Sequence, residues 1–526
     1  MRHDKGGRHV VGVALVASLA VVSAACTVTF NARRIDTTTT STTNASTPPP
    51  TSGSSGSLPL VSRLAWHACD ADFRCSTLVV PVSYSDPADG TLALAVIELP
   101  TTGNPATARD LVMNPGGPGA SGVQFLLQAA TAFPAALRQA FNLVSFDPRG
   151  IGGSDPVECV SPPELRRWVG LDPAPATRTE IVAAIAAVRA FDSACARRVP
   201  RDVLVNLSTA VTARDLDRLR AALGAPRLDY LGFSYGTYLG ALYAQAFPTH
   251  VGNMALDGAV DPALSEAATE QQQADAFEVD LHDFFAWCPT NTACRSELAK
   301  GAAATYDEVM SSLEAGHTLT ADLPAALGGE QQTNYGVALT GGVSSLYSTN
   351  QWPSLAEALW AAAGSGNGSD LATLAYNYSG FAANGTVENL VSANLAIACL
   401  DRPSPPISGD ALLARTFATT APDFGPAEAW GSLPCNYWPV PPTGKAAPVH
   451  LAAPIPILIV GSTHDPATPY AWARALTNQL SGAELLTRDG DGHTGYFSSA
   501  CVQNWVDRYL VTGLRPPQGS VCASNA

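Results

Sequence analysis

Short apolar segments recur along the chain and alternate with segments of helical periodicity. Apolar residues repeat at helical spacing in 212–223, which ends at Gly224, and in 235–247. Alternating strands and helices are typical of a mostly parallel sheet flanked by helices. We therefore predict an α/β fold, with strands at 78–82, 92–99, 111–114, 143–147, 228–233, 253–257 and 455–460.

The rhythm of strands and helices breaks in the middle of the chain. This part is rich in Ala, Gly, Asn and aromatic residues, and 266–285 and 354–363 look helical. We interpret it as a mainly helical cap inserted over the carboxyl edge of the sheet. The predicted organisation is residues 59–261 as the N-terminal part of the core, 262–453 as the cap, and 454–526 as the C-terminal part.

The first 58 residues form two segments whose compositions differ from that of the rest of the chain. Residues 1–25 combine a basic stretch with an apolar run at 10–22, which predicts a signal peptide. Residues 26–58 are rich in Thr, Ser and Pro, which indicates an unfolded tether. Cys26 follows Ala24-Ala25, as in a bacterial lipobox, although Ser23 stands where leucine is usual. We expect export, and we favour a cell-envelope lipoprotein attached through lipidated Cys26 over a freely secreted protein.

Cysteine content agrees with an oxidising compartment. The chain has 11 cysteines, an odd number, and an even number remains for bridges once Cys26 is set aside. One or two free thiols are the alternative, and metal binding is disfavoured because no C-x-x-C pair occurs. Neighbours in sequence suggest Cys69–Cys75, Cys159–Cys195, Cys288–Cys294, Cys399–Cys435 and Cys501–Cys522.

Net charge excludes one class of partner. The formal charge is −15, so the chain would repel nucleic acid phosphates. The charge does not favour anionic membrane surfaces either.

A nucleophile motif follows the strand expected at 228–233. Gly232-Phe233-Ser234-Tyr235-Gly236 fits G-x-S-x-G, in which a serine is held on a sharp turn between strand and helix. The motif alone is weak, and a surface turn with an idle serine is the alternative. The strand before it and the helix after it favour Ser234 as the nucleophile.

The acid and the base are expected later in the chain, in that order. Asp465 follows the apolar strand at 455–460, and His493 lies in the glycine-rich segment 489–495. His493 would take the serine proton, and Asp465 would orient the imidazole. Thr468 is a candidate for support within the triad. The rival base is His464, and the rival acids are Asp489 and Asp491.

A glycine-rich loop after the strand at 111–114 predicts an oxyanion hole. In Asn114-Pro115-Gly116-Gly117-Pro118-Gly119, the glycines let backbone N–H groups approach a developing negative charge. We expect the donors to be Gly117 and the residue after the nucleophile, Tyr235. A phosphate loop is disfavoured because its lysine is missing. We assign Arg149, in Asp147-Pro148-Arg149-Gly150, to a structural turn with supporting ion pairs.

Together these motifs resemble the tripeptidyl aminopeptidases, a group of the prolyl-aminopeptidase-like serine peptidases. The resemblance rests on N-P-G-G-P-G-x-S-G, D-P-R-G-x-G-x-S, G-F-S-Y-G-T-Y-L-G and P-I-L-I-V-G-S-T-x-D-P-A-T-P with D-G-H. It extends from about Pro59 to the C-terminus. It implies an α/β-hydrolase fold, peptide or protein substrates with free amino termini, and no metal or organic cofactor.

An exopeptidase must also hold a terminal ammonium, which calls for carboxylates facing the site. The candidates are Asp401, Glu266 and Glu270, although a solvated carboxylate is the simpler interpretation of each. Two other functions stay open: a carboxylesterase or lipase on the same scaffold, and a non-catalytic envelope binding protein. The first would use an identical triad. Against the second stands the intact set of predicted catalytic residues. The oligomeric state is not predicted.

Overall fold

We analysed a computed structural model that describes residues 61–382 and 384–523. The predicted signal peptide, the tether and Cys26 lie outside these residues. Within the described part of the chain, we find no helix whose length and apolar character would let it cross a bilayer.

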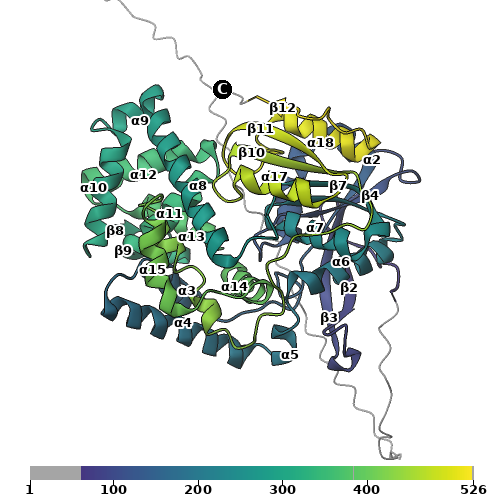
Figure 1. Cartoon of the computed structure of the whole chain (residues 1–526), viewed down its shortest axis with the longest axis horizontal. Coiled ribbons are helices and arrows are strands. Elements are labelled where there is room, and N and C mark those ends of the chain that lie inside the picture. The colour runs from purple at the N-terminus through teal and green to yellow at the C-terminus, as the bar shows by residue number, and fades with distance from the viewer. Residues whose placement is uncertain (1–60, 383, 524–526) are drawn as a thin grey trace, which may run out of the picture. The chain divides into compact units, whose positions relative to one another are not determined.

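The core is a ten-stranded, mainly parallel sheet with the strand order β1-β2-β3-β5-β4-β6-β7-β10-β11-β12 (Figure 1). The pairs β1/β2, β2/β3 and β3/β5 are antiparallel, and the rest are parallel. The prediction of a mostly parallel α/β sheet is confirmed. The strands are β1 (His67–Asp70), β2 (Phe73–Pro81), β3 (Thr91–Leu99), β4 (Arg109–Asn114), β5 (Phe141–Phe146), β6 (Leu228–Phe233), β7 (Val251–Asp257), β10 (Ile457–His464), β11 (Glu484–Asp491) and β12 (Val521–Cys522).

Helices cover both faces of this sheet. The apolar residues of α6 (Thr209–Leu223), α7 (Tyr235–Ala246) and α17 (Tyr470–Gln479) pack on one face. Those of α1 (Gly122–Ala129), α2 (Ala135–Ala140) and α18 (Ala500–Thr512) pack on the other. Every residue of β6 is buried, as expected for a central strand covered on both sides.

The long segment between β7 and β10 is mainly helical and adds one two-stranded hairpin, β8 (Leu319–Asp322) with β9 (Glu330–Thr333). Many of its helices share a hydrophobic cluster of their own. The helices are α8 (Glu266–Trp287), α9 (Thr292–Glu297), α10 (Ala302–Glu314), α11 (Tyr335–Leu346), α12 (Trp352–Ser365), α13 (Ser369–Tyr378), α14 (Leu390–Asp401), α15 (Ile407–Phe417) and α16 (Gly425–Glu428).

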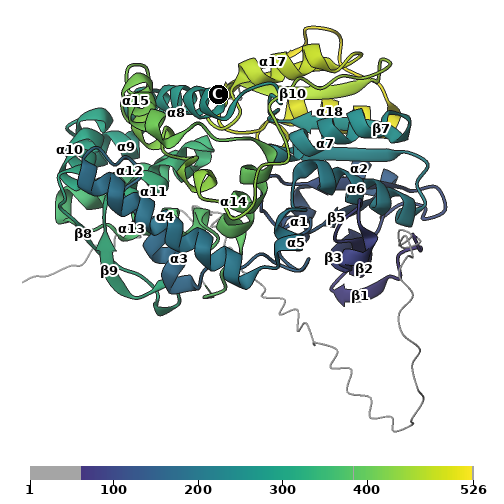
Figure 2. The same ribbon diagram turned by 60° about the horizontal axis from the view of Figure 1, so that its bottom comes forward.

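The helical layer also takes in an earlier part of the chain. Helices α3 (Pro162–Val169) and α4 (Arg178–Arg198) lie among the inserted helices rather than on the sheet (Figure 2). Leu165 and Val169 share a cluster with residues of α11 and α13, and Val188 packs with Trp430. The boundary that we expected at residue 261 therefore leaves out part of this layer. The short helix α5 (Arg201–Leu204) connects α4 to the core.

Three features of the sheet were not expected from the sequence. Strands β1 and β12 lie at its two edges and are short. Strand β11 was not among the predicted strands. It includes Asp489-Gly490-Asp491, which we expected as a loop; its backbone pairs with β10 as far as Asp491, which lies opposite His464. His493 follows two residues after the end of this strand.

The ten described cysteines form the five pairs proposed from sequence neighbours. They are Cys69–Cys75, Cys159–Cys195, Cys288–Cys294, Cys399–Cys435 and Cys501–Cys522.

Candidate active site

Ser234 lies at the turn between β6 and α7. Its backbone is in a positive-φ conformation, with φ 52° and ψ −126°, which is rare for residues other than glycine. Its N–H donates to the carbonyl oxygen of Asp257 at 2.9 Å, which ties the turn to the neighbouring strand β7. The serine side chain is thus presented at the carboxyl end of the sheet.

The two glycines of this turn are required by close backbone contacts. A Cβ on Gly232 would lie 2.5 Å from the carbonyl oxygen of Gly236. One on Gly236 would lie 2.6 Å from the carbonyl oxygen of Asn114. Any larger residue at either position would push strand, helix or oxyanion loop apart, which explains the G-x-S-x-G pattern.

His493 and Asp465 form a hydrogen-bonded pair. Nδ1 of His493 lies 2.8 Å from Oδ1 and 3.1 Å from Oδ2 of Asp465. The other ring nitrogen, Nε2, is buried and has no hydrogen bond within the described residues. His493 and Ser234 line the same cavity, so Nε2 is available for the serine hydroxyl.

Asp465 is held by several donors in addition to His493. Its Oδ1 accepts from the N–H groups of Ala467 at 3.1 Å and Thr468 at 2.8 Å. Its Oδ2 accepts from Thr494 N–H at 3.3 Å and from Thr468 Oγ1 at 3.1 Å. The Thr468 hydroxyl also lies 3.3 Å from His493 Nδ1. These bonds fix the carboxylate against the imidazole and give Thr468 a contact with both members of the pair.

A second buried acid supports the histidine loop, and the sequence analysis missed it. Asp257, at the end of β7, is fully buried. Its carboxylate accepts from Gly495 N–H at 2.9 Å and from Tyr496 N–H at 2.7 Å. Burial raises the pKa of Asp257 to about 6. In the sequence, the one indication of this role is that Asp257 ends the strand next to the one that carries Ser234.

The electrostatics of His493 predict a pH profile. Burial favours the neutral ring, but the charge and hydrogen bond of Asp465 outweigh it and raise the pKa of His493 above its ordinary value. A base must be neutral, so activity is lost as pH falls through this raised pKa. If His493 is the base, we expect kcat/KM to rise with pH with a midpoint above the ordinary pKa of a histidine. A midpoint at or below that ordinary value in a pH–rate profile would contradict the pairing of His493 with a charged Asp465.

The expected oxyanion donors lie on two sides of Ser234. Tyr235 is the first residue of α7, where backbone N–H groups have no partner within the helix. Gly117 lines the cavity that contains Ser234. Gly116 packs directly on the nucleophile, since a Cβ there would lie 2.9 Å from the Cβ of Ser234. The loop is therefore close enough for its backbone to face a substrate carbonyl at Ser234.

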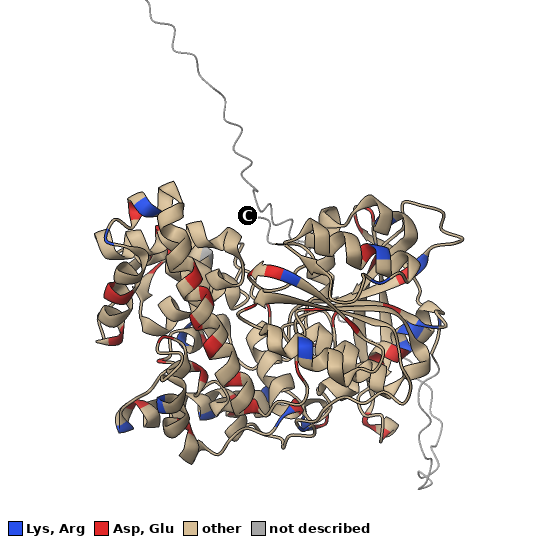
Figure 3. Ribbon diagram, turned by 45° about the horizontal axis from the view of Figure 1, so that its top comes forward, with Lys and Arg blue, Asp and Glu red and all other residues tan. Residues whose placement is uncertain are grey.

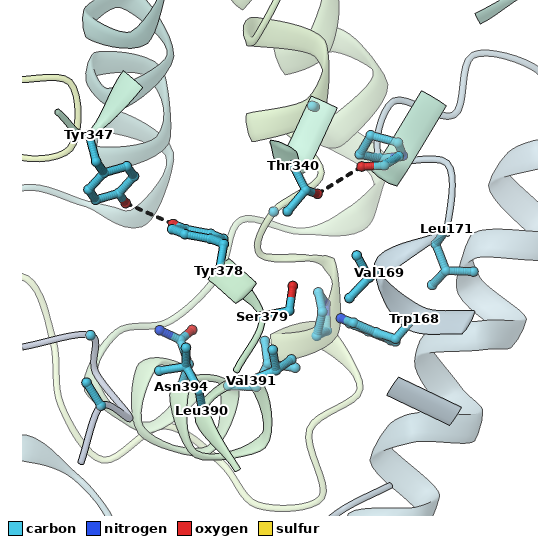
Figure 4. Close-up of a pocket in the computed structure, with 18 of the residues that line it drawn as sticks. Trp168, Val169, Leu171, Thr340, Tyr347, Tyr378, Ser379, Leu390, Val391 and Asn394 are labelled. Atoms are coloured by element: carbon cyan, nitrogen blue, oxygen red, sulfur yellow. Dashed lines mark hydrogen bonds between the residues drawn. The ribbon is translucent and has the colours of Figure 1, made fainter. Parts of the chain in front are cut away.

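The cavity at Ser234 has a volume of about 750 Å³ and a mainly apolar lining. Its walls come from the core and from distant parts of the helical layer. Figure 4 shows Tyr347 and Tyr378, whose hydroxyls are 2.9 Å apart, together with Trp168 and Leu171 from the segment around α3. Asp172 is the one acidic side chain among the described residues that line it. These residues were not identified from the sequence.

The three proposed substrate carboxylates are not among the residues that line this cavity. Glu270 comes nearest through Gly431, which does line it: a Cβ on Gly431 would lie 3.5 Å from Oε1 of Glu270. Glu270 is buried, and the backbone and side chain of Ser432 are the donors beside its carboxylate. Burial and the charge of Glu266 raise the pKa of Glu270 to about 8.

Asp401 and Arg149 are held by other partners. The carboxylate of Asp401 accepts from the N–H of Thr209 at 2.8 Å and from its hydroxyl, which also bonds Tyr235. Asp401 lines a different cavity, so we no longer assign it to the ammonium. Arg149 is buried in a two-pronged ion pair with Asp215, at 2.6 and 2.7 Å, and supports the turn after β5.

The rival residues lie outside the Ser234 cavity. His464 bonds Asp491 at 2.6 Å, and Asp489 accepts from Thr463 at 3.2 Å. None of His464, Asp489 and Asp491 lines the cavity that contains Ser234.

Comparison with known proteins identifies the family. A family model described as "TAP-like protein" matches residues 421–522. The serine protease Hip1 of Mycobacterium tuberculosis is 35% identical over 457 residues, covering 85% of this chain and 87% of the relative. Carboxylesterase B of the same organism is 35% identical over 495 residues, with 90% and 92% covered.

A tripeptidyl aminopeptidase of Streptomyces lividans is 33% identical over 484 residues, covering 88% of this chain and 87% of the relative. The family resemblance predicted from the motifs is thereby confirmed, and so is the assignment to serine hydrolases. The chain belongs to the tripeptidyl aminopeptidase family of serine peptidases with the α/β-hydrolase fold.

Proposed function

We propose that this serine peptidase releases short peptides, tripeptides in the first instance, from the free amino termini of its substrates. The observation that carries the proposal is the buried carboxylate of Glu270, which lies behind the Gly431 wall of the Ser234 cavity and has carboxylates, not a cation, as its charged neighbours. A cavity of about 750 Å³ has room for a few residues beyond the scissile bond. A carboxylate at its far end would bind the terminal ammonium and so fix the number of residues between the amino terminus and the scissile bond.

Two further carboxyl groups, those of Glu266 and Glu428, are the charged neighbours of Glu270. Burial raises the pKa of Glu428 to about 7, and burial also raises that of Glu266. Glu266 has one cation nearby, Arg402, at 3.9 Å. Three carboxyl groups with raised pKa values would gain most from a cationic ligand, because an ammonium favours their ionised forms. The group therefore suits an amino terminus better than an acetylated one.

The reaction follows from the geometry at Ser234. The serine oxygen attacks the scissile carbonyl as His493 takes its proton, and the tetrahedral oxyanion is stabilised by the N–H groups of Gly117 and Tyr235. Asp465 stabilises the imidazolium. His493 then protonates the leaving amine as the C–N bond breaks, which leaves an acyl-serine. A water molecule, deprotonated by His493, hydrolyses this ester and restores the serine.

Export also remains a proposal. Five disulfides are compatible with an oxidising compartment. We propose that the chain is exported and held at the cell envelope through lipidated Cys26.

The decisive experiment compares a tripeptide anilide carrying a free amine with its N-acetylated twin. We expect kcat/KM to favour the free amine by at least about 30-fold, because a buried charged hydrogen bond typically contributes about 2–5 kcal/mol. Equal rates would indicate an endopeptidase and contradict the proposal. Longer and shorter free-amine substrates would measure the preferred length.

A substitution of Glu270 tests where the ammonium binds. Glu270→Gln keeps the shape of the side chain and removes its charge. We expect the preference for the free amine to fall about 10- to 100-fold, whereas cleavage of the acetylated substrate stays unchanged. Glu308→Gln, an exposed glutamate on α10, is the matched control. An unchanged preference in Glu270→Gln, with a loss in Asp172→Asn, would move the ammonium site to Asp172.

An esterase activity is the second candidate. Carboxylesterase B is as similar to this chain as Hip1 is, and the apolar lining of the cavity would also accept an acyl chain. Short acyl esters added to the same assay distinguish the two. Hydrolysis of esters without cleavage of either anilide would replace the peptidase proposal.

A further inference from the structure

A group of metal-ligand side chains lies where α8 meets the ends of two core strands. Asp283 is on α8, and His464 and Asp491 are the last residues of β10 and β11. Nδ1 of His464 lies 2.6 Å from Oδ1 of Asp491 and 3.1 Å from Oδ2 of Asp283. One ligand atom from each residue lies within 4.8 Å of the other two.

In this arrangement, two carboxylates, those of Asp283 and Asp491, lie within hydrogen-bonding distance of the same ring nitrogen of His464. A ring nitrogen can carry only one proton, so it can donate to only one of them. Oδ2 of Asp283 is correspondingly buried with no hydrogen bond of normal geometry to the described residues. A metal ion in the place of that proton would bind the nitrogen and both oxygens together. The side chains of His464 and Asp283 are 47% and 33% exposed, so an ion can reach them from solvent.

Asp280 is an independent observation that also points to a cation. It lies one turn before Asp283, on the same side of α8. It is fully buried, and neither of its carboxylate oxygens has a hydrogen bond to any described residue. Its charged neighbours are mainly other carboxylates, Asp283, Asp465 and Asp491, and the nearby cation is Arg488. A buried carboxyl group without a donor is disfavoured in its charged form, and an ion bound beside it would favour that form.

The surrounding charge favours the same conclusion. Acidic residues recur along α8 from Glu266 to Asp283, and the helix carries no Lys or Arg; Figure 3 shows the acidic positions in red. Because α8 carries no Lys or Arg, no permanent cation from this helix competes for the carboxylate of Asp283.

We propose that Asp283, His464 and Asp491 bind one divalent cation of the kind that accepts both imidazole and carboxylate ligands, Zn²⁺ or Mn²⁺, with Asp280 as a neighbouring acidic group. Calcium and magnesium are disfavoured because they prefer oxygen ligands only. The ion would join α8 to the residue directly before the catalytic acid, Asp465. It would thus stabilise the contact between the helical layer and the acid loop, and it takes no part in the reaction itself.

The test is direct metal binding to the full chain. The protein is freed of any polyhistidine tag, treated with EDTA and desalted, and then titrated calorimetrically with ZnCl₂, MnCl₂ or CaCl₂. We expect one equivalent of Zn²⁺ or Mn²⁺ to bind, with Ca²⁺ at least tenfold weaker. His464→Ala and Asp283→Asn should each weaken binding at least tenfold. His317→Ala, which removes an exposed imidazole elsewhere in the helical layer, should leave binding unchanged.

Thermal unfolding gives a second readout that separates metal binding from misfolding. Metal should raise the Tm of the wild-type chain, and this rise should be lost in Asp280→Asn, which keeps the side-chain volume. Circular dichroism establishes that each variant is folded. Absence of saturable binding, binding that neither His464→Ala nor Asp283→Asn weakens, or a preference for Ca²⁺ would overturn the proposal. Because the readout is binding, the result does not depend on the proposed peptidase activity.

Discussion

Replacing Ser234 by alanine should lower kcat by a factor on the order of 10⁴–10⁶ while leaving the fold intact. The substitution removes only one oxygen from a residue that faces the cavity. The turn itself is held by backbone contacts, including the bond from Ser234 N–H to Asp257, which alanine keeps. Residual activity would come from the oxyanion donors and from binding, which the variant retains.

The measurement is steady-state hydrolysis of the free-amine tripeptide anilide by the wild-type and Ser234→Ala chains, with circular dichroism on both. Ser311→Ala, an exposed serine on α10, is the matched control and should keep full activity. An activity within tenfold of wild type in Ser234→Ala would remove Ser234 from the nucleophile role and with it the proposed mechanism.

The elbow, the acid and the base are predicted from the sequence because each belongs to a local pattern; in the fold, Ser234 and His493 line one cavity and His493 pairs with Asp465. Gly232 and Gly236 are dictated by backbone contacts within a few residues of Ser234, together with the neighbouring loop. Asp465 follows an apolar strand and His493 lies in a glycine-rich segment further along the chain, in the order that this fold uses. Such patterns can be recognised in a single sequence because strand, turn and helix depend on residues that are close together in the chain.

The cavity wall could not be predicted, because it depends on how distant segments pack. Trp168, Tyr347, Tyr378 and Trp430 come from four separate parts of the helical layer and meet only in the folded chain. Their spacing along the sequence carries no signal of this convergence. Helices α3 and α4 illustrate the same limit, since their apolar residues pack on the helical insertion and not on the sheet beside which they stand in sequence.

The partners of each carboxyl group, and not its burial, separated the candidate carboxylates. Asp401 and Glu270 look alike in sequence, as acidic residues in helical segments, and both are buried in the fold. Asp401 is held by both donors of Thr209 at a different cavity, whereas Glu270 lies behind the wall of the Ser234 cavity with carboxylates as its charged neighbours. The number of donors that reach a carboxylate is a property of tertiary packing, so the sequence left the two indistinguishable.

Replacing Asp465 by asparagine should lower kcat by roughly 10³–10⁴ and change KM little. Asp465 is 1% exposed and does not line the cavity, so it contributes to the reaction through His493 and not through the substrate. The carboxylate accepts the Nδ1 proton of His493, which leaves Nε2 free to accept the proton of the serine. An amide in its place can turn its NH₂ toward Nδ1 and favour the opposite tautomer, in which Nε2 carries the proton.

The pH profile of the same variant separates this role from a structural one. The charge of Asp465 raises the pKa of His493 against the effect of burial. Without that charge, burial dominates, so the acid limb of kcat/KM should move to lower pH than in the wild type. Asp489→Asn, an exposed carboxylate on β11, is the matched control and should change neither rate nor profile. If Asp465→Asn lost activity with an unshifted acid limb and a lowered Tm, Asp465 would be a structural residue and the acid would have to be sought elsewhere, first at the buried Asp257.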